Sequence, residues 1–298
     1  MNLKSPPLIS VIIPTYNHAN FLGKALESVI QQTYNNWEAI VVDNQSTDET
    51  NQIINKYSDP RIQYFKISNN GIIAKSRNLG INNSKGEWIA FLDSDDWWTK
   101  DKLEVCLENI DDKVDFVYHQ LEIVYDKSNS YLKKKNIGRQ LKKPILNNLL
   151  TSEIDQGNAI GNSSVMLRKD MLSRIGGISE NKKMVASEDF NTWLRIAQIT
   201  DKFNFIKKKL GYYLVHSESS QKRDLSIPHR EAVIEFMELF NDKQKLNLEV
   251  KLKYMSGNYN SLNNNYAKAK EDFLFVLKNG GINFKLRSLL KTIWIIFK

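Results

Sequence analysis

Short apolar runs alternate with amphipathic helical segments through the first third of the chain. Residues 8–14 (LISVIIP) form a continuous β-branched run, which is typical of a strand buried on both faces of a sheet. Similar runs lie at 37–43 (WEAIVVD), 61–67 and 87–93 (EWIAFLD), and between them apolar residues recur at helical spacing. This alternation predicts an α/β fold with a mostly parallel, Rossmann-like sheet that carries helices on both faces.

The remaining elements are predicted from the same patterns. Asn20 is placed to cap a helix that continues to Ile30, and Ser187 precedes another helix. Further strands are predicted at 114–125, 163–168, 203–206 and 212–215. From about residue 228 the pattern is helical, with inner faces at Met237, Leu239, Leu246 and Leu252. We therefore expect a sheet domain over 1–225 and a helical C-terminal extension over 226–298.

Polar residues follow the ends of three predicted strands. They are Thr15, Tyr16 and Asn17 after the first run, Asp43 at the end of the second, and Asp93–Asp96 after the fourth. Ligands of open parallel sheets bind beyond the carboxyl ends of the strands. The sequence thus predicts a polar site built from separate segments.

Charge and cysteine content narrow the function classes. The 298 residues contain 42 Lys and Arg against 34 Asp and Glu, a net charge of +8 that suits an acidic ligand or an anionic membrane surface. The basic residues are spread out and lack interleaved aromatics, so no nucleic-acid partner is expected. The single cysteine, Cys106, excludes an internal disulfide and a thiolate metal site. With no signal peptide and no long apolar span in the sequence, we expect a soluble, cytoplasmic protein.

Asp93 and Asp95 are candidate metal ligands. Two residues apart at a strand end, their carboxylates point to the same side if the strand geometry continues, whereas Asp96 points away. Such a pair can hold a hard divalent cation, Mn²⁺ or Mg²⁺, with positions left for a diphosphate. The alternative is a capped helix start at Asp95 and Asp96. Because no glycine-rich phosphate loop is present, a bound nucleotide needs another countercharge, and a metal supplies one.

An ordered set of motifs resembles glycosyltransferase family 2, and in particular its bacterial cell-surface polysaccharide enzymes. The set comprises 8–17 (LISVIIPTYN), 41–50 (VVDNQSTDET), 75–86 (KSRNLGINNSKG), 91–96 (FLDSDD) and Glu188-Asp189. The resemblance covers about residues 8–216. It implies a GT-A fold and inverting transfer of a sugar from a nucleotide diphosphate donor.

The resemblance also implies site roles. It assigns contacts with the base and ribose to Pro14, Thr15, Tyr16 and Asn17, and contact with the base edge to Asp43. Arg77 is placed on the diphosphate side of the pocket. Asp93 would contact the ribose or the metal, with Ser94 beside it, and Asp95 would bind the metal together with His216. An inverting transfer needs one carboxylate to take the proton of the acceptor hydroxyl. Asp189 is the candidate base, and Glu188 positions or contacts the acceptor. The alternative for this pair is a favourable charge at a helix N-terminus.

Substrates and rivals follow from the same comparison. The resemblance implies a UDP-sugar donor and a glycan or lipid-linked glycan acceptor in cell-surface polysaccharide synthesis. A processive Q-x-x-R-W element is absent, so one sugar per encounter is expected. The rival functions are a sugar-phosphate nucleotidyltransferase, which would need a glycine-rich N-terminal loop, and a nucleotide-sugar-binding protein without catalysis.

Two features outside the motifs carry expectations of their own. Residues 284–298 place Leu286, Leu289, Leu290, Ile293 and Phe297 on one helical face, with basic residues elsewhere. This pattern predicts either a peripheral membrane contact through 284–298, on the inner membrane face, or docking on the protein's own core. His18, His119 and His229 are predicted to be surface or packing residues.

Overall fold

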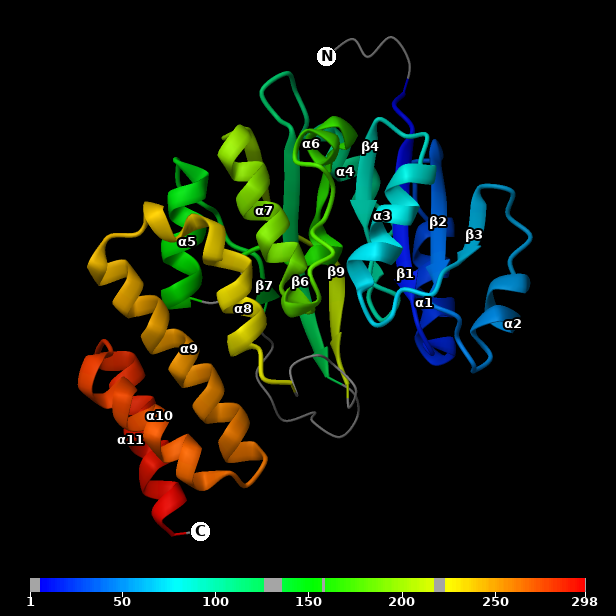
Figure 1. Cartoon of the computed structure of the whole chain (residues 1–298). Helices are drawn as coiled ribbons and strands as arrows, with labels where there is room; N and C mark the ends of the chain where they lie inside the picture. Colours follow the sequence, from blue (N-terminus) through cyan, green and yellow to red (C-terminus); the bar gives the residue numbers. More distant parts are fainter. Residues whose placement is uncertain (1–5, 126–135, 157–158, 217–222, 298) are drawn as a thin grey trace.

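One mixed sheet organises the structure, with strands in the order β3-β2-β1-β4-β8-β6-β9-β5 and β7 paired to β6 (Figure 1). The computed structural model describes residues 6–125, 136–156, 159–216 and 223–297. Its strands are β1 Ile9–Thr15, β2 Trp37–Asp43, β3 Ile62–Lys66, β4 Trp88–Phe91, β5 Trp97–Trp98, β6 Phe116–Tyr125, β7 Asn136–Ile137, β8 Met166–Arg168 and β9 Phe203–Val215.

The first half of the sheet is parallel, and its strands β1, β2 and β4 are buried on both faces, as predicted, whereas the edge strand β3 is half-buried. β2 and β4 flank β1 in parallel, and β3 continues the sheet beyond β2. Alternate side chains enter different cores: Ile12 and Ile40 pack on one face, and Val11 and Val41 on the other. Continuous apolar runs rather than alternating ones are what such a sheet requires.

Helices cover both faces. The core around Val11 receives side chains from α1 (Ala19–Ile30), α2 (Thr50–Asn55) and α4 (Lys102–Glu108). The core around Ile12 receives them from α3 (Ile73–Asn83), α5 (Ile145–Gln156), α6 (Lys169–Arg174) and α7 (Glu188–Ile199). The predicted α/β class with helices on both faces is confirmed.

The second half of the sheet is mixed. β8 pairs antiparallel to both β4 and β6, while β9 pairs parallel to β6 and antiparallel to the short β5. The sequence predicted two strands here, because the exposed lysines 207–209 interrupt the apolar pattern. The structure has the single strand β9, because pairing with β6 continues on both sides of these lysines. β5 follows Asp96 directly, so the alternative of a helix start at Asp95 and Asp96 is wrong.

The first helix begins earlier than predicted. The N-cap of α1 is His18 instead of Asn20, and the cap makes no side-chain hydrogen bond of its own. The Asp48 carboxylate, from the loop after β2, accepts a hydrogen bond from the Ala19 backbone N–H at 3.0 Å. A residue distant in sequence therefore satisfies the helix start, which local patterns do not reveal.

The C-terminal helices begin on the sheet domain and extend away from it (Figure 1). They are α8 Ser226–Val233, a 3₁₀ helix η5 Ile234–Leu239, α9 Asp242–Leu262, α10 Tyr266–Asn279 and α11 Ile282–Ile296. Phe236 and Leu252 belong to the core around Ile12, whereas Phe273 and Ile295 form a separate small core. Leu239 and Leu246, predicted to face inward, are exposed. None of the helices within the described residues combines the length and the hydropathy needed to cross a bilayer.

Candidate functional site

The predicted site segments meet at one rim of the sheet. The parallel register places Thr15 opposite Asp43, and β4 runs beside β1 in the same direction. The polar residues that follow these three strands therefore leave the sheet at the same end, as expected for a parallel sheet. The polar residues are therefore brought together because the three strands run in the same direction.

The loops after β1 and β2 are fastened to each other through Asn17. Its backbone N–H donates to the Ser46 hydroxyl at 2.8 Å, and its side-chain oxygen accepts from the Thr47 N–H at 2.8 Å. Asn17 adopts φ of 50°, a left-handed conformation that Asn tolerates better than most residues. The N-terminal motif and the second-strand motif thus form one structural unit.

Asp43 is fully buried beneath these loops. One carboxylate oxygen accepts from the backbone N–H of Ser46 at 2.9 Å, and the other accepts from the Tyr64 hydroxyl at 2.7 Å. Burial and the neighbouring Asp43 both raise the pKa of Tyr64, so this phenol stays a donor. Asp43 holds the loop in shape, and its contact with a base edge stays a prediction.

The other residues of the N-terminal turn differ in exposure. Pro14 and Thr15 are buried in β1, whereas 53% of Tyr16 is exposed and Asn17 is half-buried. Within the described residues the Thr15 hydroxyl has no hydrogen-bond partner, which is uncommon for a buried polar atom. Tyr16 and Asn17 are the members of this turn that a ligand can reach.

Arg77 joins two motifs that are far apart in sequence. Its guanidinium donates to Oε1 of Glu188 at 2.6 Å and to Oδ1 of Asp93 at 2.8 Å. Burial alone would lower the pKa of Arg77, but the carboxylates of Asp93 and Glu188 raise it above its ordinary value, so the charge is permanent. Arg77 is only 4% exposed. Its described contacts are with protein carboxylates, and its predicted position near a diphosphate stays a prediction.

Glu188 and Asp189 open helix α7 beside Arg77 but are held differently. The second oxygen of Glu188 accepts from the Ala186 N–H at 2.7 Å, so this buried side chain is fixed at both oxygens. Asp189 is half-buried. Burial and the negative charge of Glu188 raise the pKa of Asp189 to about 7, against the opposing effect of Arg77. A carboxylate with this pKa can take up a proton near neutral pH.

Asp95 and His216 form the most metal-like pair of the site. Oδ2 of Asp95 lies 3.0 Å from Nε2 of His216, although the two residues are 121 positions apart. Carboxylate oxygen and imidazole nitrogen suit Mn²⁺, and the oxygen also suits Mg²⁺. Among the described residues no three His, Cys, Asp or Glu side chains are grouped as a metal site. Asp95 and His216 would supply two ligands to such an ion.

Asp93 and Ser94 directly precede Asp95 in the chain and contact other residues of the site. Oδ1 of Asp93 accepts from Arg77 and also from the Asn162 side-chain amide at 2.9 Å, and burial raises its pKa. The Ser94 hydroxyl lies 2.7 Å from Nδ1 of His18. His18 was predicted to be a surface or packing residue and instead lies at the site, its ring 6.0 Å from that of His216. Its position directly after P-T-Y-N was the signal for it.

Asp96, which the spacing predicted to point away from Asp93 and Asp95, is buried, and it was not expected to matter for the site. One of its oxygens accepts from the Ser163 hydroxyl at 2.6 Å and the other from the Leu214 N–H at 3.0 Å. Burial, together with the charges of Asp95 and Asp93, raises its pKa well above the usual range. Asp96 thereby fixes the acidic turn to β9 and so positions His216.

The predictions that His119 and His229 are packing residues are confirmed. His119 is fully buried, and burial lowers its pKa to about 3. The His229 ring stacks on Phe190 with 5.1 Å between centroids. Both are packing residues. Ser163 and Asn162, by contrast, contact Asp93 and lie in the 3₁₀ turn η2 (Asn162–Ser164), which no motif indicated.

Comparison with known proteins identifies the family. The family model described as Glycosyl transferase family 2 matches residues 10–175, more than half of the chain. The chain belongs to glycosyl transferase family 2. The resemblance seen in its motifs is thereby confirmed. WfaP of Escherichia coli, named a UDP-Glc:alpha-D-GlcNAc-diphosphoundecaprenol beta-1,3-glucosyltransferase, is 32% identical over 215 residues, which are 71% of this chain and 79% of WfaP.

Other relatives of this family-2 chain match over shorter stretches. TuaG of Bacillus subtilis, named for teichuronic acid biosynthesis, is 43% identical over 104 residues, 34% of this chain and 41% of TuaG. An uncharacterized glycosyltransferase of Rickettsia bellii is 42% identical over 132 residues, 44% of this chain. The match spans only 19% of the Rickettsia protein, so this chain corresponds to a minor part of it.

Solved structures confirm the GT-A type of fold. TarS of Staphylococcus aureus in complex with UDP-GlcNAc superimposes with a TM-score of 0.65, at 20% identity, over 96% of this chain and 88% of that one. The mannosyltransferase PcManGT of Pyrobaculum calidifontis, in complex with GDP-Man and Mn²⁺, gives a TM-score of 0.61 at 17% identity, over 99% and 82%. At such identities the likeness concerns the fold alone.

Proposed function

We propose that this family-2 chain transfers a single sugar from a nucleotide diphosphate sugar, with a UDP-sugar as the first choice, to an acceptor hydroxyl with inversion at the anomeric carbon. The family membership supports the reaction class. The UDP-sugar follows from the resemblance and from the name of WfaP, which specifies a UDP-glucose donor.

The observation that carries the proposal is the carboxylate pair at the start of α7. Arg77 fixes and neutralises Glu188, which leaves the half-buried Asp189 as the group of the pair with a pKa of about 7. A general base works best when its pKa lies near the operating pH. Asp189 is therefore the proposed base, and Glu188 positions the acceptor side of the site.

The bonds balance in one displacement. Asp189 takes the proton of the acceptor hydroxyl while that oxygen attacks the anomeric carbon of the donor. The bond between this carbon and the diphosphate oxygen breaks on the opposite side, and the nucleoside diphosphate leaves with the electron pair. A hydrolysing glycosidase would instead need a second carboxyl to protonate the leaving group.

The donor side is assigned to the loops after β1, β2 and β4. Tyr16 and Asn17 are proposed to contact the base and ribose, and Asp93 with Ser94 the ribose and diphosphate. Asp95 and His216 would hold Mn²⁺ or Mg²⁺, which when bound supplies the positive charge that stabilises the departing diphosphate. Asp96 positions these two residues, because it follows Asp95 in the chain and accepts a hydrogen bond from the Leu214 N–H just before His216.

The acceptor is proposed to be a lipid-linked glycan used in cell-surface polysaccharide synthesis. WfaP is named for a diphosphoundecaprenol-linked acceptor, and TuaG for teichuronic acid. The assay is transfer or donor hydrolysis across a panel of UDP- and GDP-sugars with Mn²⁺, with the anomeric configuration of the product read by NMR. Asp189→Asn is compared with Asp112→Asn, an exposed loop carboxylate before β6.

We expect both variants to bind the donor and only Asp189→Asn to lose turnover. Equal turnover in the two variants would reject Asp189 as the base. Thermal shifts with donor but no turnover in the wild type would favour the rival, a nucleotide-sugar-binding protein without catalysis. Formation of a nucleotide sugar from a nucleoside triphosphate would favour the nucleotidyltransferase.

A further inference from the structure

The last helix packs with its polar side inward. In α11 the buried residues are Ser288, Thr292 and Ile295, and two of these three carry small hydroxyl side chains. Thr292 donates its hydroxyl to the Ser288 carbonyl at 2.9 Å, which satisfies it within the helix. Ile295 joins the small core with Phe273, and the rings of Phe284 and Trp294 contact Tyr254 of α9 and Tyr266 of α10, so the rest of the apolar surface of α11 is not needed to hold the helix in place.

The opposite side of α11 is apolar and faces outward. Six of its residues, hereafter the α11 outer face, are between 44% and 83% exposed: Leu286, Leu289, Leu290, Ile293, Trp294 and Phe297. Five of them form the stripe predicted from the sequence either to contact a membrane or to dock on the protein's own core. In the structure these five residues are exposed and do not dock on the core. Contiguous apolar patches of this kind on a protein surface mark interaction sites.

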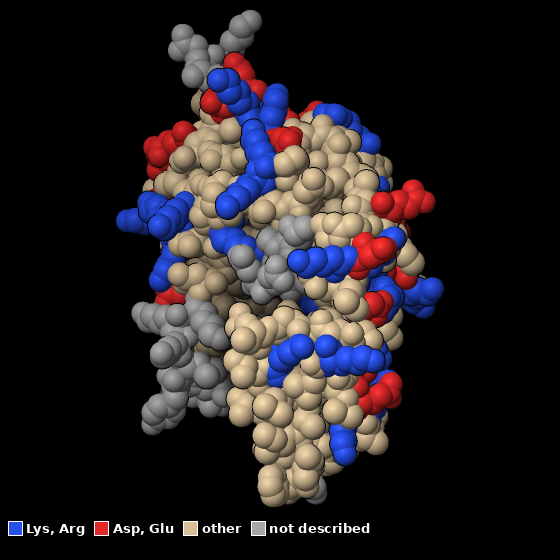
Figure 2. Space-filling model, turned by 90° about the vertical axis from the view of Figure 1, so that its left-hand side faces the viewer, with Lys and Arg blue, Asp and Glu red and all other residues tan. Residues whose placement is uncertain are grey.

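The charges around the α11 outer face have one sign. From residue 279 to 297 the chain has no Asp or Glu, but it has Lys285, Arg287 and Lys291. At 100° per residue, Lys285 borders one side of the face, and Arg287 and Lys291 border the other. In Figure 2 the lower part of the molecule is largely uncharged, with basic side chains across its upper portion and acidic ones only at one edge. This combination suits the headgroup region of an anionic bilayer.

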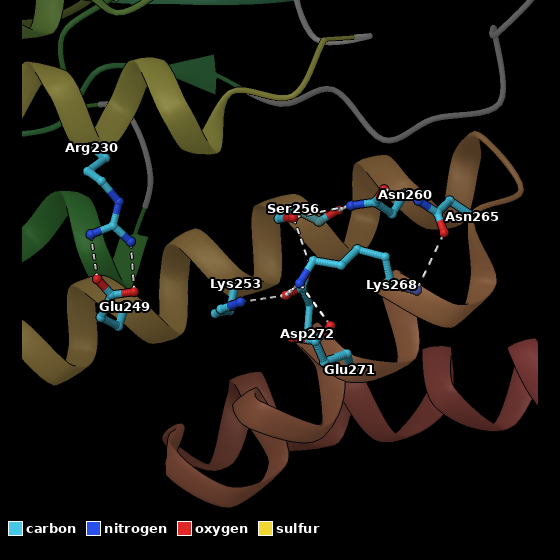
Figure 3. Close-up of polar contacts among 9 residues, drawn as sticks. All are labelled: Arg230, Glu249, Lys253, Ser256, Asn260, Asn265, Lys268, Glu271 and Asp272. Atoms are coloured by element: carbon cyan, nitrogen blue, oxygen red, sulfur yellow. Dashed lines mark hydrogen bonds and ion pairs between the residues drawn. The ribbon is translucent and has the colours of Figure 1, made fainter.

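Helices α9 and α10, on which α11 packs, are joined by polar contacts and close packing (Figure 3). The fully buried Asp272 of α10 accepts from Lys253 at 2.9 Å and from the Ser256 hydroxyl at 2.7 Å, both on α9. A Cβ at Gly257 would come within 2.8 Å of the Phe273 ring, so α9 and α10 approach as closely as glycine allows. The helix that carries the α11 outer face therefore rests on a closely packed pair of helices, α9 and α10.

α11 runs toward the end of the molecule at which two strands of the sheet end (Figure 1). β6 and β9 point their carboxyl ends toward the same end of the molecule as that reached by α11 and the C-terminus (Figure 1). His216 follows β9 directly, so the metal-like pair lies at this end of the sheet.

We propose that the α11 outer face docks on an anionic bilayer, with the helix in the plane of the surface, its apolar side chains at the acyl boundary and its basic side chains among the headgroups. The inference extends the lipid-linked acceptor of the proposed function, but it rests on the exposed surface and not on the activity. A two-fold contact between copies is disfavoured, because it would bring Lys285, Arg287 and Lys291 against the same basic residues of the other copy.

The test is flotation of the full chain with vesicles of phosphatidylcholine alone or mixed with phosphatidylglycerol. The variant Leu286→Ser/Leu290→Ser/Phe297→Ser removes apolar side chains that are already exposed. Its matched control, Ile227→Ser/Ile234→Ser/Leu239→Ser, changes residues that are 63%, 54% and 54% exposed on α8 and η5. We expect the first variant to lower partitioning into the mixed vesicles by about tenfold or more, and the control to leave it unchanged.

The charge dependence gives a second readout. Lys285→Gln/Arg287→Gln/Lys291→Gln should weaken binding to the mixed vesicles, and high salt should weaken wild-type binding, because headgroup attraction is screened. No binding by the wild type, or equal losses in the two serine variants, would overturn the proposal. So would a wild-type dimer by light scattering that the first variant abolishes without any vesicle binding. Asp189→Asn should bind vesicles normally, which separates this test from that of the activity.

Discussion

Arg77 and Glu188, 111 positions apart in the chain, form a buried ion pair with 2.6 Å between Nη1 and Oε1. The same guanidinium reaches Asp93 at 2.8 Å, so one side chain connects the acidic turn after β4 with the start of α7. The donor side and the proposed base are thus held in a fixed relation by a single residue.

Replacing Arg77 by Met should destabilise the protein strongly, because Glu188 and Asp93 would lose their buried countercharge. Breaking a buried pair in this way costs about 3–5 kcal/mol. The matched control is Arg230→Met, which removes a half-exposed ion pair with Glu249 and should cost less than about 1 kcal/mol. Urea unfolding measures both. Similar losses in the two variants would mean that Arg77 does not bridge the motifs.

Asp189→Asn should abolish turnover without destabilising the fold. The loss expected for a general base is about 10²- to 10⁴-fold in kcat. Because the folded pKa of Asp189 is raised to about 7, ionisation of this group costs stability as pH rises from its unfolded pKa of about 4 through 7. The variant should therefore melt at the same temperature as the wild type near pH 4 and at a higher one at pH 8. A lower melting temperature at pH 8 would contradict the raised pKa.

The pH profile of the wild type should have a rising limb near neutrality. Below about pH 7 Asp189 is protonated and cannot accept the proton of an acceptor hydroxyl, and above it the carboxylate is free to do so. Initial rates at saturating donor, measured from pH 5 to 9, should rise with a midpoint near 7. A rate that is flat between pH 5.5 and 8 would assign the base to another group.

Asp95→Asn and His216→Ala should weaken the coupling between metal and nucleotide. Both residues lie at the pair proposed to hold the ion, so Mn²⁺ should enhance the thermal shift by UDP in the wild type, and EDTA should remove this enhancement. In the variants the shift should be small and insensitive to EDTA. Asp112→Asn serves as the control. A full Mn²⁺ effect in His216→Ala would remove the histidine from the metal site.

Gly257→Ala should destabilise the C-terminal helices, since the new methyl carbon would lie 2.8 Å from the Phe273 ring. Overpacking of this kind costs about 1–3 kcal/mol. Gly23→Ala, within α1, meets its nearest atom at 3.4 Å and should be neutral or stabilising, because alanine is the better helix former. Thermal unfolding of the two variants compares them directly. Equal melting temperatures would show that α9 can move away from α10.

The sequence alone was sufficient for the family, the fold class and the segments that meet at the rim of the sheet. Those segments follow strand ends, and the direction of a parallel strand already fixes the rim at which its last residues emerge. The apolar stripe of α11 could also be predicted from the sequence, because the spacing of residues along a helix is a local property. The start of α1 was misplaced, since its stabilising contact comes from Asp48, across a loop.

Only the tertiary structure decided which side chains meet. The Asp95–His216 pair, the position of His18 at Ser94 and the clamp of Asp93 by Asn162 join residues that local periodicity does not relate. Which side of α11 packs inward was likewise decided by the tertiary structure, in which Ser288, Thr292 and Ile295 are buried. Secondary structure is encoded by neighbours in the chain, whereas pKa values, ion pairs and exposed faces depend on contacts between distant segments, which form only when the sheet and its helices pack.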